Sequence, residues 1–292
     1  MKIRLYTDVC DFYQVACATL ARHEAQNLIP LGNLIMGYEG KDKTDWRDPA
    51  NWVMATVKNQ EGIQLTALMT PPHNITLYAT DNKINPLALD CLIEALVDCP
   101  IPGVMSEKQL ALQFATAYTR AKGLDYVTVM DQRIYQLIQV NPDIPCVGTV
   151  RLAEEKDMYF FPFWAEAFYS ASDIKKRTMN IPYHTEHYLH RISSKKVYIL
   201  EVDGMPVSMA GYTREMQSTI GVAFVYTPPS LRGKGYASSA VAQISKMALE
   251  RGFTKCVLYT DLANPTSNHI YQNIGYAPVC DSVMLKFAQR SK

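Results

Sequence analysis

The segment Val225–Ala237 constrains the fold more than any other part of this 292-residue chain. An apolar strand pattern over residues 219–226 runs into two adjacent prolines, and a short loop with two glycines then leads into an amphipathic helix pattern over residues 235–252. Glycine lets backbone N–H groups crowd around a phosphate, and a helix N-terminus presents unpaired donors. The segment therefore predicts a pyrophosphate cradle, with an ordinary glycine-rich turn as the alternative.

Two better-known phosphate loops do not fit this segment. A Walker A loop requires Ser or Thr directly after its lysine, and Lys234 is followed by glycine. A dinucleotide-binding loop follows the first strand of a parallel unit. Here the preceding sequence predicts an antiparallel meander, with strands over residues 197–202, 206–214 and 219–226 and a hairpin turn at Asp203-Gly204.

A second polar constellation follows downstream of the loop. Asn264 and Ser267 can cap a short helix, Tyr271 follows Asn264 by seven positions, and Gly275 can end that helix before Tyr276. Taken alone, Asn264 can be a capping residue and Tyr271 a core aromatic. Taken with the glycine loop, the pair indicates a site.

The order of the predicted elements occurs twice. A stretch with two prolines over residues 140–147 predicts a boundary near residue 146. Before it we expect helices over 11–27, 87–97 and 108–122, strands over 52–57, 63–69, 74–79, 101–105 and 126–130, and helix-like sequence after 130. After it we expect strands over 148–152, 197–202, 206–214, 219–226, 256–260 and 282–287 and helices over 159–171, 182–192, 235–252 and 267–274. This repetition indicates a duplicated α+β unit.

Over residues 148–287 the sequence resembles the GNAT superfamily, the Gcn-five-related N-acetyltransferases. Arg232–Ala237 matches the family's R/Q-x-x-G-x-G/A loop, and Asn264, Tyr271 and Gly275-Tyr276 match its downstream pattern. The resemblance implies an α+β fold of two tandem GNAT-like domains, each a mixed, mostly antiparallel sheet flanked by helices. Residues 147–292 would be the catalytic domain. Residues 1–146 would be a degenerate copy, because residues 80–86 lack the loop motif.

The resemblance also implies a role for each matched position. Backbone groups at the end of the strand would bind the pantetheine arm of acetyl-CoA and polarise the acyl carbonyl, and the loop would hold the pyrophosphate. Tyr271 would protonate the leaving thiolate, since a phenol with a pKa of about 10 tolerably matches a thiol near 8.5. The implied cofactor-binding residues are Val225, Tyr226, Thr227, Arg232, Gly233, Lys234, Gly235, Tyr236, Ala237 and Asn264, and the implied catalytic residue is Tyr271.

The sequence does not identify the general base that the attacking amine needs. Glu201 and Glu215 are the acids nearest to the expected cleft, and solvated hairpin charge is the alternative for each. Cys256 has no predicted histidine partner, so direct transfer is favoured over an acyl-cysteine. We expect no metal: the histidines His184, His187 and His190 do not form H-E-x-x-H and fit an exposed or acceptor-lining helix better.

Composition excludes several other classes of protein. The net charge is only +1, which argues against nucleic-acid binding, and no apolar run is long enough for a membrane helix. The first residues have no signal-peptide pattern, and the seven cysteines contain no C-x-x-C pair, which predicts a cytoplasmic protein with reduced thiols. We therefore expect a monomeric or homodimeric acetyl-CoA-dependent N-acetyltransferase whose acceptor is a small-molecule or peptide amine. The alternatives are an acyl-CoA-binding regulatory module without turnover and a structural pseudo-enzyme.

Overall fold

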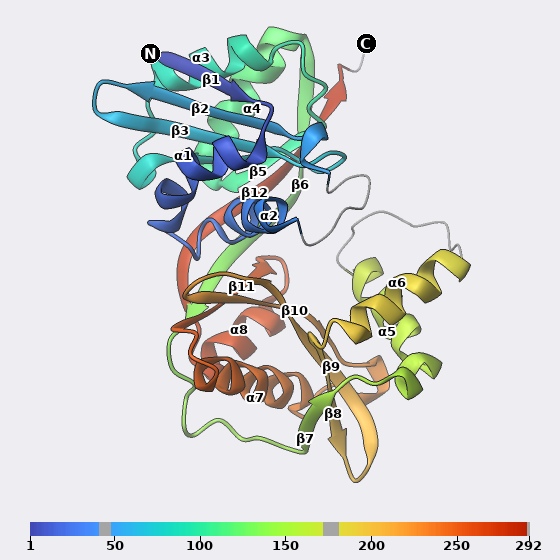
Figure 1. Ribbon diagram of the computed structural model, residues 1–292. Coiled ribbons are helices and arrows are strands. Elements are labelled where there is room, and N and C mark those ends of the chain that lie inside the picture. Colours follow the sequence, from blue (N-terminus) through green and yellow to red (C-terminus); the bar gives the residue numbers. More distant parts are fainter. Residues whose placement is uncertain (41–47, 172–180, 291–292) are drawn as a thin grey trace. The chain divides into compact units, whose positions relative to one another are not determined.

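The computed structural model describes residues 1–40, 48–171 and 181–290, without the side chains of 171 and 181–184 (Figure 1). The chain forms two compact units. The first contains residues 1–134, 259–264 and 278–292, and the second contains residues 135–258 and 265–277. In the described part of the chain, no helix is long and apolar enough to cross a membrane.

The first unit is built on an antiparallel sheet with the strand order β1-β2-β3-β4. A further strand, β5, pairs antiparallel with β12. Val104 of β5 also forms one parallel bridge with Ile75, the residue directly before β4. Its elements are β1 (Lys2–Tyr6), α1 (Val9–Ala21), α2 (Leu28–Glu39), β2 (Val53–Asn59), β3 (Gly62–Met69), β4 (Thr76–Ala79), α3 (Pro86–Leu96), β5 (Gly103–Glu107), α4 (Lys108–Lys122), most of β6 (Leu124–Leu137) and most of β12 (Ala277–Gln289).

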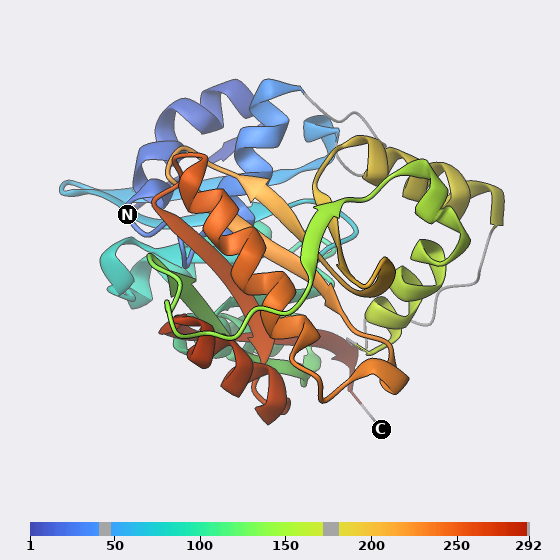
Figure 2. The ribbon, with the colours of Figure 1, turned by 90° about the horizontal axis from the view of Figure 1, so that it is seen from below.

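The second unit repeats this arrangement. Antiparallel strands follow the order β7-β8-β9-β10, and β10 pairs in parallel with β11. In Figure 2, α7 crosses one face of β8, β9 and β10, and it buries Ala240, Val241 and Ile244 there. The other face packs against α5 and α6. The elements are β7 (Thr149–Leu152), α5 (Phe161–Ala171), α6 (Ile181–Ser193), β8 (Val197–Val202), β9 (Met205–Glu215), β10 (Thr219–Tyr226), α7 (Tyr236–Glu250), β11 (Lys255–Asp261) and α8 (Pro265–Ile274).

The predicted duplication is confirmed. Each half of the chain runs strand, two helices, three strands, helix, strand, helix, strand, so that β4, α3 and β5 correspond to β10, α7 and β11. The compact units nevertheless do not divide at residue 146. The end of β6, Tyr135–Leu137, packs in the core of the second unit, and the C-terminal part of β12 pairs with β5 in the first.

Two predicted elements differ from the observed ones, and one observed strand was not predicted. The helix expected over 11–27 ends at Ala21, and α2 follows, with Pro30 in its first turn, where a missing N–H costs no hydrogen bond. The strand expected over 126–130 extends to Leu137, so the sequence after 130 is not helical. A first strand, β1, was not predicted.

Candidate active site

The end of β10 carries a bulge that reorients its side chains. Two of its residues, Phe224 and Val225, face the single residue Ala210 of β9. Phe224 has φ 64, a left-handed conformation that bulky residues rarely adopt. Val225 consequently packs on the face under α7, while Phe224 and Tyr226 pack against α5 and α6. Ile220 and Val222 lie on the same face as Val225, so the bulge shifts the alternation of side chains by one residue and moves Phe224 to the face of α5 and α6.

The parallel pairing of β10 with β11 stops well before this bulge. Among the described residues it runs from Thr219, opposite Lys255, only to Gly221, opposite Val257. The backbone of Val225 and Tyr226 thus lies outside that ladder. Tyr226 still pairs with Met209 of β9, so only the side of the strand end that faces away from β9 is left without a strand partner among the described residues. The role of this backbone at the cofactor stays a prediction.

Two hydroxyl groups and a guanidinium hold the end of β10. Ser208, fully buried on β9, donates to the carbonyl oxygen of Tyr226 at 3.0 Å, and its hydroxyl lies 2.8 Å from that of Thr227. The Nε of Arg232 donates to the Thr227 carbonyl at 3.0 Å. The Arg232 side chain therefore ties the glycine loop to the strand.

The glycine loop has the geometry of an open cradle. Gly233 and Gly235 both have φ 77, and a Cβ on either would meet no atom within 4 Å. Gly235 is also the N-cap of α7, and no described side chain caps this helix end. The loop residues Arg232 to Gly235 are exposed, Lys234 among them. Uncapped amides, a helix dipole and nearby positive charge are the requirements for binding a pyrophosphate.

Tyr271 lies on α8, at the second of the two predicted sites. Its ring contacts that of Tyr276 edge-on at 6.0 Å and packs on the core of the second unit. Among the described residues, no group forms a hydrogen bond with its hydroxyl, and burial raises the pKa of Tyr271 to about 12. Tyr271 is therefore protonated at neutral pH and can donate a hydrogen bond to a ligand.

Asn264 occupies the turn directly before α8. Its backbone N–H donates to the carbonyl oxygen of Asp261 at 3.1 Å, and it groups with the first unit, while the loop and Tyr271 belong to the second. Its role at the cofactor stays a prediction. The predicted site residues of the second unit come from two places: the β10–α7 connection and α8.

The two candidate bases are both engaged in ion pairs. Glu201 pairs with Arg151 at 2.8 Å. Glu215 lies within ion-pairing distance of Arg251, at 3.3 Å, and of Lys196, at 3.7 Å. Glu215 also pairs with Ile220, near the start of β10, about 20 Å along the strand from its bulged end. This arrangement favours the structural alternative for both acids.

Cys256 is fully buried, and its thiol points at the carbonyl oxygen of Ser245 at 3.6 Å. Burial raises the pKa of Cys256 to about 12, so it carries no thiolate near neutral pH. Of the three α6 histidines, His184 has its side chain outside the described residues. The described residues contain no group of three potential metal ligands.

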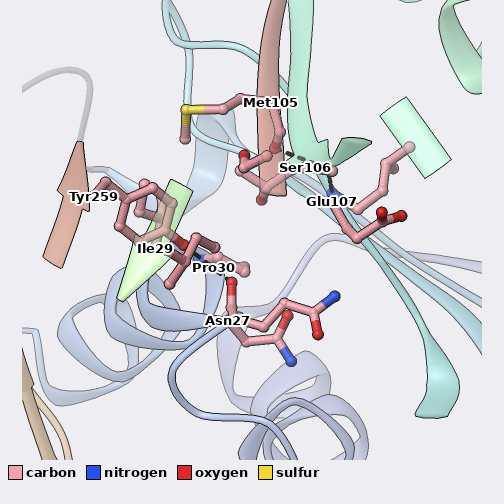
Figure 3. Close-up of a pocket in the computed structure, with 12 residues that line it drawn as sticks. Asn27, Ile29, Pro30, Met105, Ser106, Glu107 and Tyr259 are labelled. Carbon is pink, nitrogen blue, oxygen red and sulfur yellow. Dashed lines mark hydrogen bonds between the residues drawn. The ribbon is translucent and has the colours of Figure 1, made fainter. Parts of the chain in front are cut away.

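The counterpart of this site in the first unit is filled by its own side chains. The N-terminus of α3 is capped by Asn85, which accepts from the N–H groups of Leu87 and Ala88, and Pro86 has no N–H to offer. Where β4 and β5 separate, Ser106 accepts from the N–H of Leu77 at 2.7 Å. The cavity beside it, shown in Figure 3 with Ser106 facing the side chains of α2, measures about 10 Å³, which is room for one water at most.

Two of these features could not be read from the local sequence pattern. Ser208 is a single serine in an apolar strand, which only its burial makes informative. The positive φ of Phe224 carries no sequence signal, because glycine or asparagine is the usual residue there.

Comparisons with known proteins agree with this geometry. The part of the chain from β7 to α8, which contains the bulged strand and the open glycine loop, matches a known family. Residues 151–276 match the family model described as acetyltransferase (GNAT) family.

Solved structures extend the likeness over almost the whole chain. A Drosophila protein aligns with a TM-score of 0.68 at 10% identity, covering 99% of both chains. A GCN5-related N-acetyltransferase from Sphaerobacter thermophilus gives 0.63 at 14% identity, over 98% of this chain and 95% of its own. A GNAT-family acetyltransferase from Colwellia psychrerythraea gives 0.60 at 13%, over 98% and 99%. At these sequence identities the structural similarity establishes the tandem GNAT-like fold, but not an activity or a substrate. No curated protein matches the chain.

Proposed function

We propose that the protein is a cytoplasmic acetyl-CoA-dependent N-acetyltransferase that acetylates a small-molecule or peptide amine directly. The observation that carries the proposal is the open cradle at Gly233–Gly235, which follows the bulged end of β10 in the segment that matches the GNAT family model. All seven cysteines are free, which supports a reducing compartment.

Each part of the cradle has a chemical task. The amides of Gly233 to Ala237 would bind the pyrophosphate, and the exposed Lys234 would add positive charge. The backbone at Val225–Thr227, held by Ser208, would bind the pantetheine arm and donate to the acyl oxygen as negative charge develops there. Asn264 would contribute a further hydrogen bond to the cofactor.

The transfer itself needs one bond made and one broken. The neutral amine attacks the thioester carbonyl carbon, the C–S bond breaks, and the amine loses a proton to solvent. Moving a proton fully from a phenol with a pKa of about 12 to a thiolate near 8.5 would cost roughly 5 kcal/mol. Tyr271 therefore stabilises the developing thiolate mainly through a hydrogen bond, and the sulfur gains its proton from water.

The function is tested by release of the CoA thiol in the presence of amines. Purified protein with acetyl-CoA should release thiol only when an amine is added, and mass spectrometry should show an acetyl group on that amine. Tight acetyl-CoA binding without release for small amines, amino acids and peptides would contradict an enzyme and indicate a binding module.

We expect one acetyl-CoA per chain. The α3 end corresponding to the cradle is already capped by Asn85 and Pro86, and the gap at Ser106 has no room for a pantetheine arm. Calorimetric titration should therefore give a stoichiometry near one. Removing the cap with Asn85→Ala should leave that stoichiometry unchanged, and a value of two in the native protein would show that the first unit binds as well.

We expect Ser208→Ala to weaken acetyl-CoA binding several-fold, because the carbonyl of Tyr226 and the hydroxyl of Thr227 lose their shared partner. The stability loss should be about 1–2 kcal/mol. Thr76→Val is a matched control, since the Thr76 hydroxyl likewise donates to a carbonyl on the neighbouring strand, that of Leu68 at 2.8 Å. It should lower stability similarly and leave binding unchanged. If Ser208→Ala and Thr76→Val change acetyl-CoA binding equally, Ser208 does not position the cofactor site.

A further inference from the structure

The face of β10 away from α7 holds a cluster of aromatic rings centred on Phe224. The rings of Phe168, Tyr169 and Phe161 lie 5.0, 5.5 and 6.0 Å from it. These residues come from α5, and α6 packs against the same cluster. Phe224 is the bulge residue directly before Val225, so this cluster adjoins the backbone that would bind the acyl group.

A cation, Arg191, lies on this cluster. The guanidinium of Arg191, on α6, sits 4.4 Å from the centre of the Phe224 ring, and its Nη2 donates to the Tyr169 hydroxyl at 3.3 Å. Arg191 is half-buried. Two contacts therefore fix the plane of the guanidinium against the ring, and its remaining N–H groups have no hydrogen-bond partner among the described residues.

Among the described residues Arg191 has no counter-ion, in contrast to Arg151 and Arg251 of the same unit. Arg151, also partly buried, pairs with Asp157 and Glu201, and Arg251 pairs with Glu215. No described acid lies within ion-pairing distance of Arg191. The nearby Glu166 of α5 instead accepts a hydrogen bond from Tyr188. A partly buried charge is costly without a partner, and the described part of the chain supplies no anion for Arg191.

An anion bound by Arg191 would belong to the acceptor and not to the pyrophosphate of acetyl-CoA. The cradle forms the start of α7, which packs on one face of β10 with Val225, whereas Arg191 and Phe224 lie on the other face. A guanidinium recognises a carboxylate through two parallel hydrogen bonds. We propose that Arg191 binds a carboxylate of the acceptor, so that the preferred acceptor is an amine that also carries a carboxylate.

This inference rests on the proposed function and deepens it. Its test uses acceptors in matched sets: an amino acid, the corresponding amino-acid amide, and the decarboxylated amine, each with acetyl-CoA and thiol release as readout. The native protein should favour the amino acid over both neutral analogues by at least about 10-fold in kcat/KM, as expected for a charge-assisted hydrogen bond.

Arg191→Gln should remove this preference. We expect KM for the amino acid to rise at least about 10-fold, with little change in kcat, in the affinity for acetyl-CoA or in the rates with the neutral amines. Arg191→Lys should restore part of the preference, because the charge remains but the fork is lost. Arg251→Gln is the matched control, as Arg251 also lies against aromatic rings, of Tyr212 and Phe253, and it should leave the preference intact.

The outcomes distinguish failure of the carboxylate-binding role of Arg191 from failure of the proposed acetyltransferase activity. Equal rates for the amino acid and its neutral analogues in the native protein, or an equal loss for all three in Arg191→Gln, would overturn the role of Arg191 while an acetyltransferase remains. Absence of thiol release with every amine would overturn both.

Discussion

Replacing Gly235 with valine is expected to lower the affinity for acetyl-CoA by at least about 100-fold. Gly235 has φ 77, and its Cβ would project into the open space where the cradle faces solvent. Valine would fill this space and disfavour the left-handed conformation by about 1–2 kcal/mol, so the amides at the start of α7 would turn away from the phosphate. Calorimetric titration measures the loss.

Gly204→Val provides the control for strain alone. Gly204 has φ 74 in the turn between β8 and β9, and there too a Cβ would meet no atom within 4 Å. Both variants should lose similar stability in thermal unfolding, but Gly204→Val should bind acetyl-CoA normally. If Gly235→Val is folded and binds as tightly as the native protein, the loop is an ordinary turn and not a cradle.

Tyr271→Phe is expected to lower kcat by about 100-fold or more while the dissociation constant of acetyl-CoA stays nearly unchanged. The hydroxyl has no partner among the described residues and would act only on the sulfur as it leaves, so its loss affects the transition state and not the ground state. Single-turnover kinetics and calorimetry separate the two quantities.

Tyr276→Phe is the matched control for this position. The Tyr276 ring contacts Tyr271, and its hydroxyl lies 2.8 Å from that of Ser245 in the core. This variant should lose about 1 kcal/mol of stability and retain kcat. A large loss of acetyl-CoA affinity in Tyr271→Phe, with normal turnover, would instead make Tyr271 a binding residue.

The pKa of Tyr271 also predicts the shape of the pH profile. The phenol donates only in its protonated form, and burial raises its pKa to about 12. Activity should therefore show no decline from this group below about pH 11. A basic limb near pH 9 that disappears in Tyr271→Phe would show that Tyr271 ionises much more readily than its burial implies.

Most helices and strands could be predicted because hydrophobic periodicity and helix-ending glycines lie within the element itself. The helix expected over 108–122 matches α4, ended by Gly123 in the left-handed conformation, and the strand expected over 219–226 matches β10. The exchange of strand ends between the units was missed, because pairing partners such as Val283 and Ser106 are far apart in the chain. Neither hydrophobic periodicity nor helix-capping residues indicate which distant strands pair.

The residues of the candidate site likewise include some that the sequence predicted and some that it did not. Gly233 and Gly235 were predicted because a loop that crowds amides around a phosphate needs glycine, and the structure gives both a positive φ. Ser208 and Arg191 were missed, since their importance comes from the strand and the ring that they contact. Sequence can identify a residue type required by chemistry, but it cannot show which buried polar group supports it.

The most direct test of the cradle is hydrogen exchange of the native protein with and without saturating acetyl-CoA. We predict slower exchange in peptides covering residues 225–237, because the ligand would bind the amides at the start of α7. Peptides covering residues 80–88 should not change, because Asn85 already caps that helix. Unchanged exchange over 225–237 at saturation, or protection over 80–88 in its place, would contradict the account.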